Sequence, residues 1–448
     1  MMTDTSINPV SPTARFQSLD VLRGFAALGI LLMNIPAMGL SWDRPLPPFP
    51  VRLNADWVAL AIQEVSVAGA MRGLFTLLFG AGMIVMLTRP DPAREEAAQR
   101  AYFARCFALM LLGVANFALF LWPGEILFTY GVGGLILFLF RKADLRLLGM
   151  AAATSLILMP IGIDQARQER MEMLRLADAA TAATQAGKKP SKEQAEALKT
   201  RDEKMKALTS PETRARERAT RTSYPALLVW SMEKWSEISF TGPFTLAFQF
   251  ETLGFMLIGM ILFRTGVLTG RRSRRFYALM AIGGLVPGLI LRSIVLMTAW
   301  QAGFVPTAHS ATLQLWLYQP GRLCMTIGLL GLVSFLLKIG ALGRLADILA
   351  VVGRTALTTY IGQSIITSLL FYGLGFYDRF GFAQLMGIAV LIWIAQCTFS
   401  MLWLRRFDMG PAEWLLRSIT YGRMTPIGRR IPTDDAPPAL SSSNSSMA

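Results

Sequence analysis

The sequence predicts an all-α, polytopic transmembrane helix bundle of about ten spans with a helical extracytoplasmic insert. Three observations support this fold class. Hydrophobic residues make up 53% of the 448 residues and charged residues 16%, which is the composition of a membrane protein. The apolar residues gather in runs near the roughly 20 residues that a helix needs to cross a bilayer. Short clusters of arginine and lysine separate these runs, and one long polar segment interrupts them.

The predicted spans fall into two groups of five. The first group is 21–40, 71–88, 102–122, 126–140 and 147–163, and the second is 243–263, 276–300, 321–337, 345–371 and 380–404. The apolar run 57–88 is too long for one straight crossing at about 1.5 Å per residue. We therefore expect 57–70 to be an amphipathic or re-entrant lead-in. The first part of the ninth segment is expected at the cytoplasmic interface.

The chain is expected to divide into five parts. These are a disordered tail at 1–14, an N-terminal transmembrane bundle at 15–163, a polar helical insert with an interfacial helix at 164–242, a C-terminal transmembrane bundle at 243–404, and a cytoplasmic interfacial segment with a disordered tail at 405–448. The insert is rich in Ala, Glu, Lys and Arg, which favour helix. Ser191 and Gln194 have the spacing of a capping box, and Ser210 before Pro211 marks a further helix start.

The basic residues predict the orientation. They follow the second, fourth, sixth, eighth and tenth spans: Arg89, Arg94, Arg100 and Arg105; Arg141, Lys142 and Arg146; Arg264, Arg271, Arg272, Arg274 and Arg275; Lys338, Arg344 and Arg354; Arg405 and Arg406. Cytoplasmic loops carry an excess of Lys and Arg, so both termini are expected in the cytoplasm and the insert outside. This loop pattern also accounts for the net charge of +15. Nucleic acid is not an expected partner, because no basic face with interleaved aromatic residues occurs.

Polar residues inside the first span are the first candidates for a site. Arg23 and Asn34 lie eleven positions apart, about three helical turns, so they share one helix face. Asp20 lies one turn before Arg23. Arg and Asn are costly against lipid, so this face is expected to point at protein or a wet cavity, together with Glu251. The alternative is a cytoplasmic anchor and an interhelical hydrogen bond.

Glu251 lies inside the sixth span, where an ionisable group is a functional candidate. A structural ion pair with Arg292 or Arg322 is the alternative. Arg72, at the start of the second span, is expected either to pair with Glu64 or to hold an anionic ligand, which suits the guanidinium fork.

His309 is the single histidine and lies in the predicted outer loop 301–320. It could serve as a general base, because its pKa suits that work, or simply be solvated. The three cysteines lie in apolar runs without CxxC spacing, and no metal site is predicted.

Several motifs resemble those of a known family. LDVLRGFAALGILLMNI resembles the opening of the YeiB-like bacterial membrane proteins, which are related to heparan-α-glucosaminide N-acetyltransferase and to the membrane acyltransferases that O-acetylate surface sugars. MRGLFTLLFGAG, WPGEILFTYGVGG, FQFETLGFMLIGM, GRTALTTYIGQSII and GPAEWLLRSITYG resemble later motifs of the family. Arg23 matches the Arg of the sugar O-acetylases, but Asn34 stands where they have a His. Glu125 keeps the carboxylate of the third motif.

The resemblance implies a transmembrane acyltransferase that moves an acyl group from cytoplasmic acyl-CoA to an extracytoplasmic hydroxyl or amine, such as that of an envelope glycan. Arg23 and Arg72 would then bind the acyl-CoA. The candidate catalytic residues are Asn34, Glu125, Glu251 and His309. The alternatives are a secondary transporter or exporter of a small solute, although no repeat of the two halves is found, and a non-enzymatic assembly protein. The sequence has no GxSxG, P-loop or HExxH motif.

The resemblance also implies a location and partners. We expect an integral protein of the bacterial inner (plasma) membrane. The expected partners are membrane lipids and a small-molecule or glycan acceptor, and a homodimer is left open.

Overall fold

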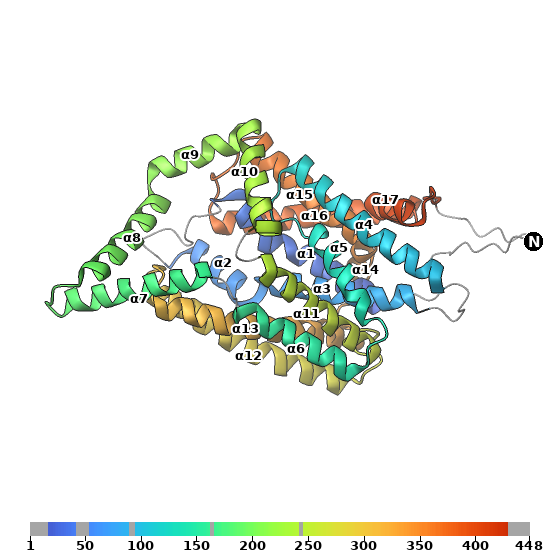
Figure 1. The fold of residues 1–448 in the computed structure, drawn as a ribbon. Helices are drawn as coiled ribbons and strands as arrows, with labels where there is room; N and C mark the ends of the chain where they lie inside the picture. Colours follow the sequence, from blue (N-terminus) through green and yellow to red (C-terminus); the bar gives the residue numbers. More distant parts are fainter. Residues whose placement is uncertain (1–16, 42–52, 89–94, 162–164, 242–244, 429–448) are drawn as a thin grey trace, which may run out of the picture.

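The computed structural model is built of helices (Figure 1). It describes residues 17–41, 53–88, 95–161, 165–241 and 245–428. The disordered tail expected at 1–14 lies outside the described residues, as do the part of the expected segment 405–448 that follows residue 428 and residues 42–52 of the Pro-rich stretch after the first span. Within the described ranges no β-sheet forms, and a single isolated bridge joins Phe407 and Gly428.

The helices follow the predicted order. The N-terminal part contains α1 (Gln17–Gly39), α2 (Ala55–Ile62), the π-helical segment η2 (Gln63–Val67), α3 (Ala70–Leu87), α4 (Glu95–Phe120), α5 (Leu127–Leu137) and α6 (Leu145–Ile161). The insert contains α7 (Gln165–Gln185), α8 (Lys192–Thr209), α9 (Pro211–Thr222) and α10 (Tyr224–Ser236). The C-terminal part contains α11 (Thr245–Arg264), α12 (Arg274–Gln301), α13 (Ala308–Lys338), α14 (Arg344–Arg354), α15 (Ala356–Ser368), α16 (Phe382–Arg406) and α17 (Pro411–Tyr421).

The chain is an all-α polytopic bundle. Seven helices of the described ranges are long and apolar enough to cross a membrane, and the pair α14 and α15, bent by 80°, makes eight. Two shorter apolar helices, Leu127–Phe140 and Leu145–Leu158, coincide with the predicted fourth and fifth spans. Each of the ten predicted segments therefore contains an apolar helix, although not all have the full length of a span.

Two of the breaks predicted in long apolar runs are found. The lead-in to the second span is α2 and η2, and it ends at Gly69, whose φ of +75° is a left-handed conformation that favours glycine. The ninth segment is divided at Thr355, between α14 and α15.

The predicted outer loop 301–320 was wrong, because α13 already begins at Ala308. The Thr307 side chain accepts a hydrogen bond from the Ser310 amide, which starts the helix there. Pro320 lies inside α13.

The basic loops lie together at one end of the bundle. Arg264 Nη2 donates to the Arg141 carbonyl (2.8 Å), and Lys338 Nζ donates to the Gly270 carbonyl (2.7 Å). Ser18, at the start of α1, donates to the Leu268 carbonyl (2.9 Å). The loops after α5, α11 and α13 and the beginning of α1 thus share one end, as the charge pattern predicts.

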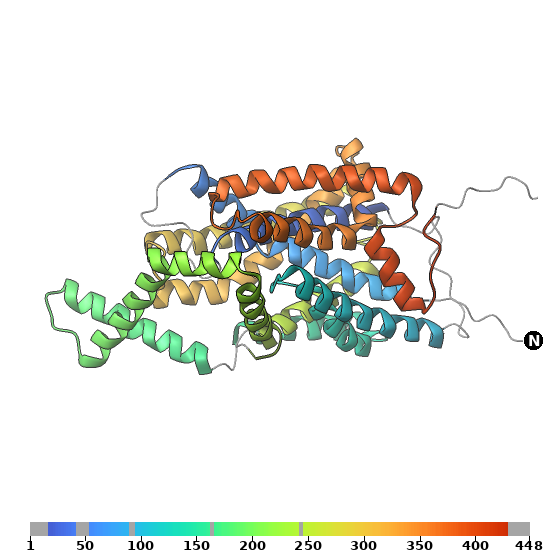
Figure 2. The same ribbon diagram turned by 90° about the horizontal axis from the view of Figure 1, so that it is seen from above.

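The insert is at the opposite end, and Figures 1 and 2 show α7, α8 and α9 forming an arm far from α17. The capping box predicted at Ser191 and Gln194 is present, and Ser210 caps α9. Asp178 of α7 accepts a hydrogen bond from the Ala308 amide (2.7 Å), which fixes the arm to the start of α13.

Close approach of helix backbones holds the site region together. Gly24 of α1 and Gly353 of α14 lie where the two helices cross. A Cβ at Gly353 would lie 1.8 Å from the Asp20 carbonyl oxygen, and one at Gly24 would lie 2.0 Å from the Leu349 carbonyl oxygen. Small residues at such crossings allow membrane helices to pack directly on one another. This crossing places Arg23 of α1 beside α14 and Arg354 of α14 beside α1.

Candidate functional site

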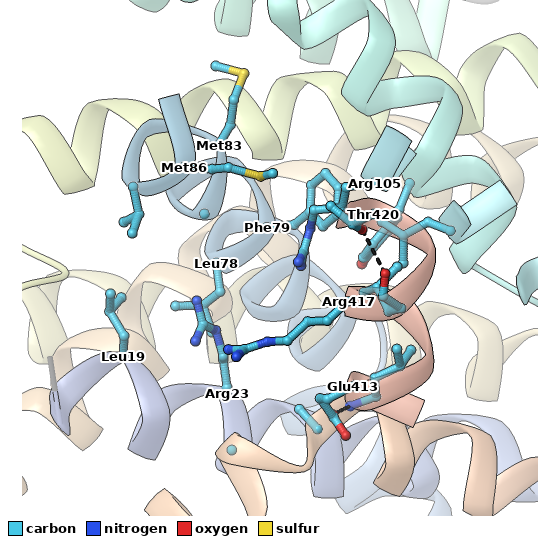
Figure 3. Close-up of a pocket in the computed structure, with 18 of the residues that line it drawn as sticks. Leu19, Arg23, Leu78, Phe79, Met83, Met86, Arg105, Glu413, Arg417 and Thr420 are labelled. Atoms are coloured by element: carbon cyan, nitrogen blue, oxygen red, sulfur yellow. Dashed lines mark hydrogen bonds between the residues drawn. The ribbon is translucent and has the colours of Figure 1, made fainter. Parts of the chain in front are cut away.

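A cavity of about 330 Å³ lies at the end of the bundle that carries the basic loops. Its charged lining residues are four arginines and two carboxylates: Arg23, Arg105, Arg354, Arg417, Asp20 and Glu413. We call it the arginine pocket. Figure 3 shows Arg23, Arg105 and Arg417 pointing toward one another inside it. Four positive and two negative side chains leave an excess of two positive charges.

The rest of the lining is mainly apolar. Side chains of α3, α4 and α5 contribute Leu78, Phe79, Met83, Met86, Leu109 and Leu127. Methionine side chains adapt readily to irregular ligands. The pocket therefore offers a cationic region and an apolar region side by side.

The arginines differ in their contacts. Arg23 Nη1 donates to Asp20 Oδ1 (3.2 Å), so the predicted pair one turn apart is formed, and 34% of the Arg23 side chain remains exposed. Arg354 Nη2 donates to the Asp408 carbonyl (3.1 Å). The cationic side chains that interact with Arg105 are Arg23 and Arg417. In the part of the chain that the structure describes, no carboxylate is close enough to pair with Arg105.

Helix α17 forms one wall of the arginine pocket, and Glu413 anchors it. The Glu413 carboxylate accepts hydrogen bonds from the amides of Leu357 (2.6 Å) and Thr358 (3.2 Å) and from Thr358 Oγ1 (2.6 Å). It thus caps the first turn of α15, where the helix dipole favours an anion. Burial raises the pKa of the Glu413 carboxyl, and the hydrogen bond from Thr358 opposes the rise. Arg417 was not among the predicted site residues. The available signal was its position one turn after Glu413 on the same helix face.

Glu251 lies in a separate cluster in the middle of the bundle. Its Oε1 accepts from Arg72 Nη2 (2.7 Å) and pairs with Arg322 Nη1, and its Oε2 accepts from Gln319 Nε2 (3.0 Å). We call Arg72, Glu251, Gln319 and Arg322 the buried ion cluster. Glu251 is 3% exposed and Arg322 is 0% exposed. Arg292 and Arg322 were the two predicted partners of Glu251, and the structure shows the pair with Arg322.

Arg72 and Arg292 each contact the carboxylate that was expected to pair with the other. Arg72 binds Glu251 rather than Glu64, and Arg292 lies 3.6 Å from the Glu64 carboxylate. With both oxygens engaged, Glu251 acts in this conformation as a structural partner of two guanidinium groups.

A short hydrogen-bonded chain joins the arginine pocket to the buried ion cluster. Tyr130, which lines the pocket, shares a hydrogen bond of 2.6 Å with Thr76 Oγ1. Thr76 Oγ1 also contacts the Arg72 carbonyl at 2.7 Å. Tyr130 and Thr76 thus separate the cavity from Arg72 and Glu251.

The other predicted catalytic residues lie elsewhere. Asn34 is half-buried on α1, and His309 is exposed in the first turn of α13. Glu125 is 3% exposed and caps α5, accepting from the Phe128 amide at 3.0 Å. None of the three lines the arginine pocket. Asn34 and Glu251 therefore do not share that cavity with Arg23, contrary to expectation. Among the described residues, no cluster of three or more His, Cys, Asp or Glu could hold a metal ion.

Comparison with known proteins relates the chain to uncharacterised bacterial proteins. Residues 262–423 match the family model described as "Protein of unknown function (DUF418)". The chain is 29% identical to "Uncharacterized protein YeiB" of Escherichia coli (strain K12), over 90% of this chain and 95% of the relative. The chain is also 28% identical to "Uncharacterized protein YxaH" of Bacillus subtilis (strain 168), over 95% of this chain and 99% of the relative. No solved structure matches it.

The region matched by the family model supplies only one side of the arginine pocket. Arg354, Glu413 and Arg417 lie within residues 262–423. Arg23 and Arg105 come from α1 and α4, outside that region. The pocket therefore requires both halves of the chain.

Proposed function

We propose that this protein is a transmembrane acyltransferase that binds acyl-CoA in the arginine pocket. The acyl group passes to a hydroxyl or amine acceptor, such as an envelope glycan, that enters from the end carrying the insert. The observation that carries the proposal is the convergence of Arg23, Arg105 and Arg417 beside an apolar wall. The basic end is the cytoplasmic end under the positive-inside rule, where acyl-CoA is available.

The charge of the pocket suits the phosphates of acyl-CoA. Guanidinium groups bind phosphate oxygens through paired, charge-assisted hydrogen bonds. Converging arginines at the edge of a membrane repel one another, and an anionic ligand removes that repulsion. Arg105 has no carboxylate partner among the described residues, so its guanidinium is the one most in need of such a ligand.

The apolar part of the pocket suits the acyl chain and the thioester. Met83, Met86 and Leu109 line it beside the arginines. A purely polar anion, such as a free sugar phosphate, would leave this wall without contacts. In the transfer step the acceptor oxygen or nitrogen attacks the thioester carbonyl, the C–S bond breaks, and the acceptor proton ends on the released thiol. Glu251 lies on the far side of Tyr130 from the pocket and holds Arg72 in place.

A secondary transporter or exporter of a small solute is the second candidate. The break between η2 and α3 favours it, because discontinuous helices often form the binding sites of transporters. This candidate predicts movement of an intact solute across the membrane with no chemical change.

Binding and turnover of acyl-CoA test the proposal. Purified protein in lipid nanodiscs is titrated with acetyl-CoA and with octanoyl-CoA, using thermal stability and calorimetry as readouts. A ligand that binds only the native state stabilises it by mass action. We expect saturable stabilisation that Arg417→Gln abolishes. The matched control is Arg406→Gln, an exposed arginine at the same end that does not line the pocket.

Transfer is then followed with acyl-labelled CoA and an envelope glycan fraction. Label on the acceptor, lost in Arg417→Gln and retained in Arg406→Gln, supports acyl transfer. Absence of acyl-CoA binding in the wild-type protein overturns the proposal. Binding without transfer, accompanied by flux of an intact solute into proteoliposomes, favours the transporter.

A further inference from the structure

A second cavity lies at the opposite end of α3 from the arginine pocket. Its volume is about 150 Å³, and its lining includes Leu60, Glu64, Arg292, Leu296, Gln314 and Tyr318. We call it the η2 pocket, because Glu64 belongs to that π-helical segment. The arginine pocket is lined by α3 residues between Phe75 and Met86, whereas η2 precedes the first residue of α3. The two cavities are therefore separate.

The backbone beside the η2 pocket is held in a broken conformation. Arg292 Nε donates to the Glu64 carbonyl (2.6 Å), and Arg322 Nε donates to the Gly69 carbonyl (2.7 Å). Non-helical backbone at membrane depth is tolerated where it is buried in protein or lines a cavity. Single-turn π-helical segments are also frequent at functional sites. Two buried arginines thus fix the backbone of this segment, and Glu64 at its start lines the cavity.

The two charged residues of the η2 pocket are incompletely satisfied. Arg292 is 4% exposed, and its Nη1 atom has no hydrogen-bond partner among the described residues. The nearest approach of the Arg292 guanidinium to the Glu64 carboxylate is 3.6 Å, longer than a hydrogen bond, and 42% of the Glu64 side chain is exposed. A buried donor without a partner costs free energy. The pocket therefore presents one unused cationic donor and one accessible carboxylate.

We propose that the η2 pocket binds a small zwitterion, a molecule with a carboxylate and an ammonium group such as a free α-amino acid. The carboxylate binds Arg292, the ammonium group binds Glu64, and the remainder of the molecule packs on Leu60 and Leu296. A simple anion would face the Glu64 carboxylate, and a simple amine would face the Arg292 guanidinium. Only a ligand carrying both charges satisfies both residues, and the small volume suits a molecule of this size.

The inference does not rest on the proposed acyltransferase activity. Arg23, Arg105 and Arg417 contribute nothing to the η2 pocket, and Glu64 and Arg292 contribute nothing to the arginine pocket. Loss of acyl-CoA binding and loss of zwitterion binding are therefore measured independently on the same preparation.

The test compares ligands with matched carbon skeletons. Nanodisc-embedded protein is titrated calorimetrically with L-leucine and L-alanine, with 4-methylpentanoate as the carboxylate alone, and with isoamylamine as the amine alone. We expect saturable binding of at least one amino acid and at least tenfold weaker binding of both single-charge probes. Failure of both amino acids to bind, or equal binding of the single-charge probes, overturns the proposal.

Two variants locate the binding. Glu64→Gln removes the charge that faces the ammonium group and should weaken amino-acid binding at least tenfold. Leu60→Trp fills the cavity without changing a charge and should abolish binding. Glu212→Gln, an exposed carboxylate of the insert, is the control and should bind as the wild type does. Wild-type binding by both pocket variants would place the amino acid elsewhere and overturn the assignment. Thermal unfolding of each ligand-free variant shows that it is folded.

Discussion

Arg23 of the first described helix and Arg417 of the last point toward each other across the arginine pocket (Figure 3). Like charges at short range in a medium of low polarity repel strongly. The fold holds them there through two fixed contacts, the Arg23–Asp20 pair and the Glu413 cap on α15. Binding of the phosphates of the proposed acyl-CoA would relieve this repulsion.

Replacing Arg23 by lysine tests whether the guanidinium shape is needed. Lysine keeps the charge but offers a point charge in place of a planar fork. We expect Arg23→Lys to weaken acyl-CoA binding at least tenfold, which is roughly 1.4 kcal/mol, with unchanged membrane insertion. Calorimetry on purified protein measures the affinity, and Arg406→Lys is the matched control. If Arg23→Lys binds acyl-CoA with wild-type affinity, Arg23 acts only as a cytoplasmic anchor, since the positive-inside rule counts Lys and Arg alike.

Glu413 is expected to hold α17 in place. Glu413→Ala removes the acceptor for two amides and one hydroxyl of α15. Hydrogen bonds to charged groups are worth about 1.5–3 kcal/mol, so we expect a lower unfolding temperature together with loss of acyl-CoA binding. Glu212→Ala, on the exposed surface of the insert, should change neither. Unimpaired acyl-CoA binding by Glu413→Ala would show that α17 does not form the pocket wall in solution.

The buried ion cluster should respond strongly to loss of its carboxylate. Glu251→Gln leaves Arg72 and Arg322 without their shared counter-charge, and breaking a buried pair typically costs about 3–5 kcal/mol. We expect a large fall in stability in detergent, measured by the midpoint of thermal unfolding. Glu96→Gln breaks a pair with Arg100 in which both side chains are mostly exposed, and it should have little effect. Equal stability of the two variants would contradict the buried arrangement.

The crossing of α1 and α14 should not tolerate a larger residue. Gly353→Leu would force a side chain against the Asp20 carbonyl, separate the two helices and displace Arg23. We expect little folded protein from this variant by size-exclusion chromatography. Gly387→Leu on α16, where a Cβ meets no atom within 4 Å, is the control. Normal yield and acyl-CoA affinity of Gly353→Leu would contradict the close crossing.

The orientation in the membrane is open to a direct measurement. The background has Cys106, Cys324 and Cys397 replaced. In it, a cysteine at position 199 should react with a membrane-impermeant reagent in cells in which only the outer membrane is permeabilised. A cysteine at position 272 should react only after the inner membrane is breached, because it lies at the basic end. The reverse pattern would place the insert in the cytoplasm.

The helices were predictable from the sequence because their signals are local. The length of each apolar run predicted the position of each segment. Ser191 and Gln194, which are three positions apart, predicted the start of α8. The Arg23–Asp20 pair was predictable for the same reason, since one helical turn separates the two residues.

The partners between helices were not predictable in this way. Arg72 and Glu251 are separated by 179 positions and Arg292 and Glu64 by 228, and which intramembrane arginine meets which carboxylate depends on how the helices pack. The loop was expected to extend to Pro320, but Pro320 lies inside α13. Membrane helices accept proline where their neighbours satisfy the freed backbone groups.

The arginine pocket has a further consequence for biosynthesis. Its walls combine α1, α3 and α4 with α17, and α17 is the last helix described in the chain. Every other helix of the pocket emerges from the ribosome before the helix that carries Arg417. The nascent protein can therefore insert the apolar segments that precede α17 while the arginine pocket is still incomplete, so the four arginines come together only after α17 has been made.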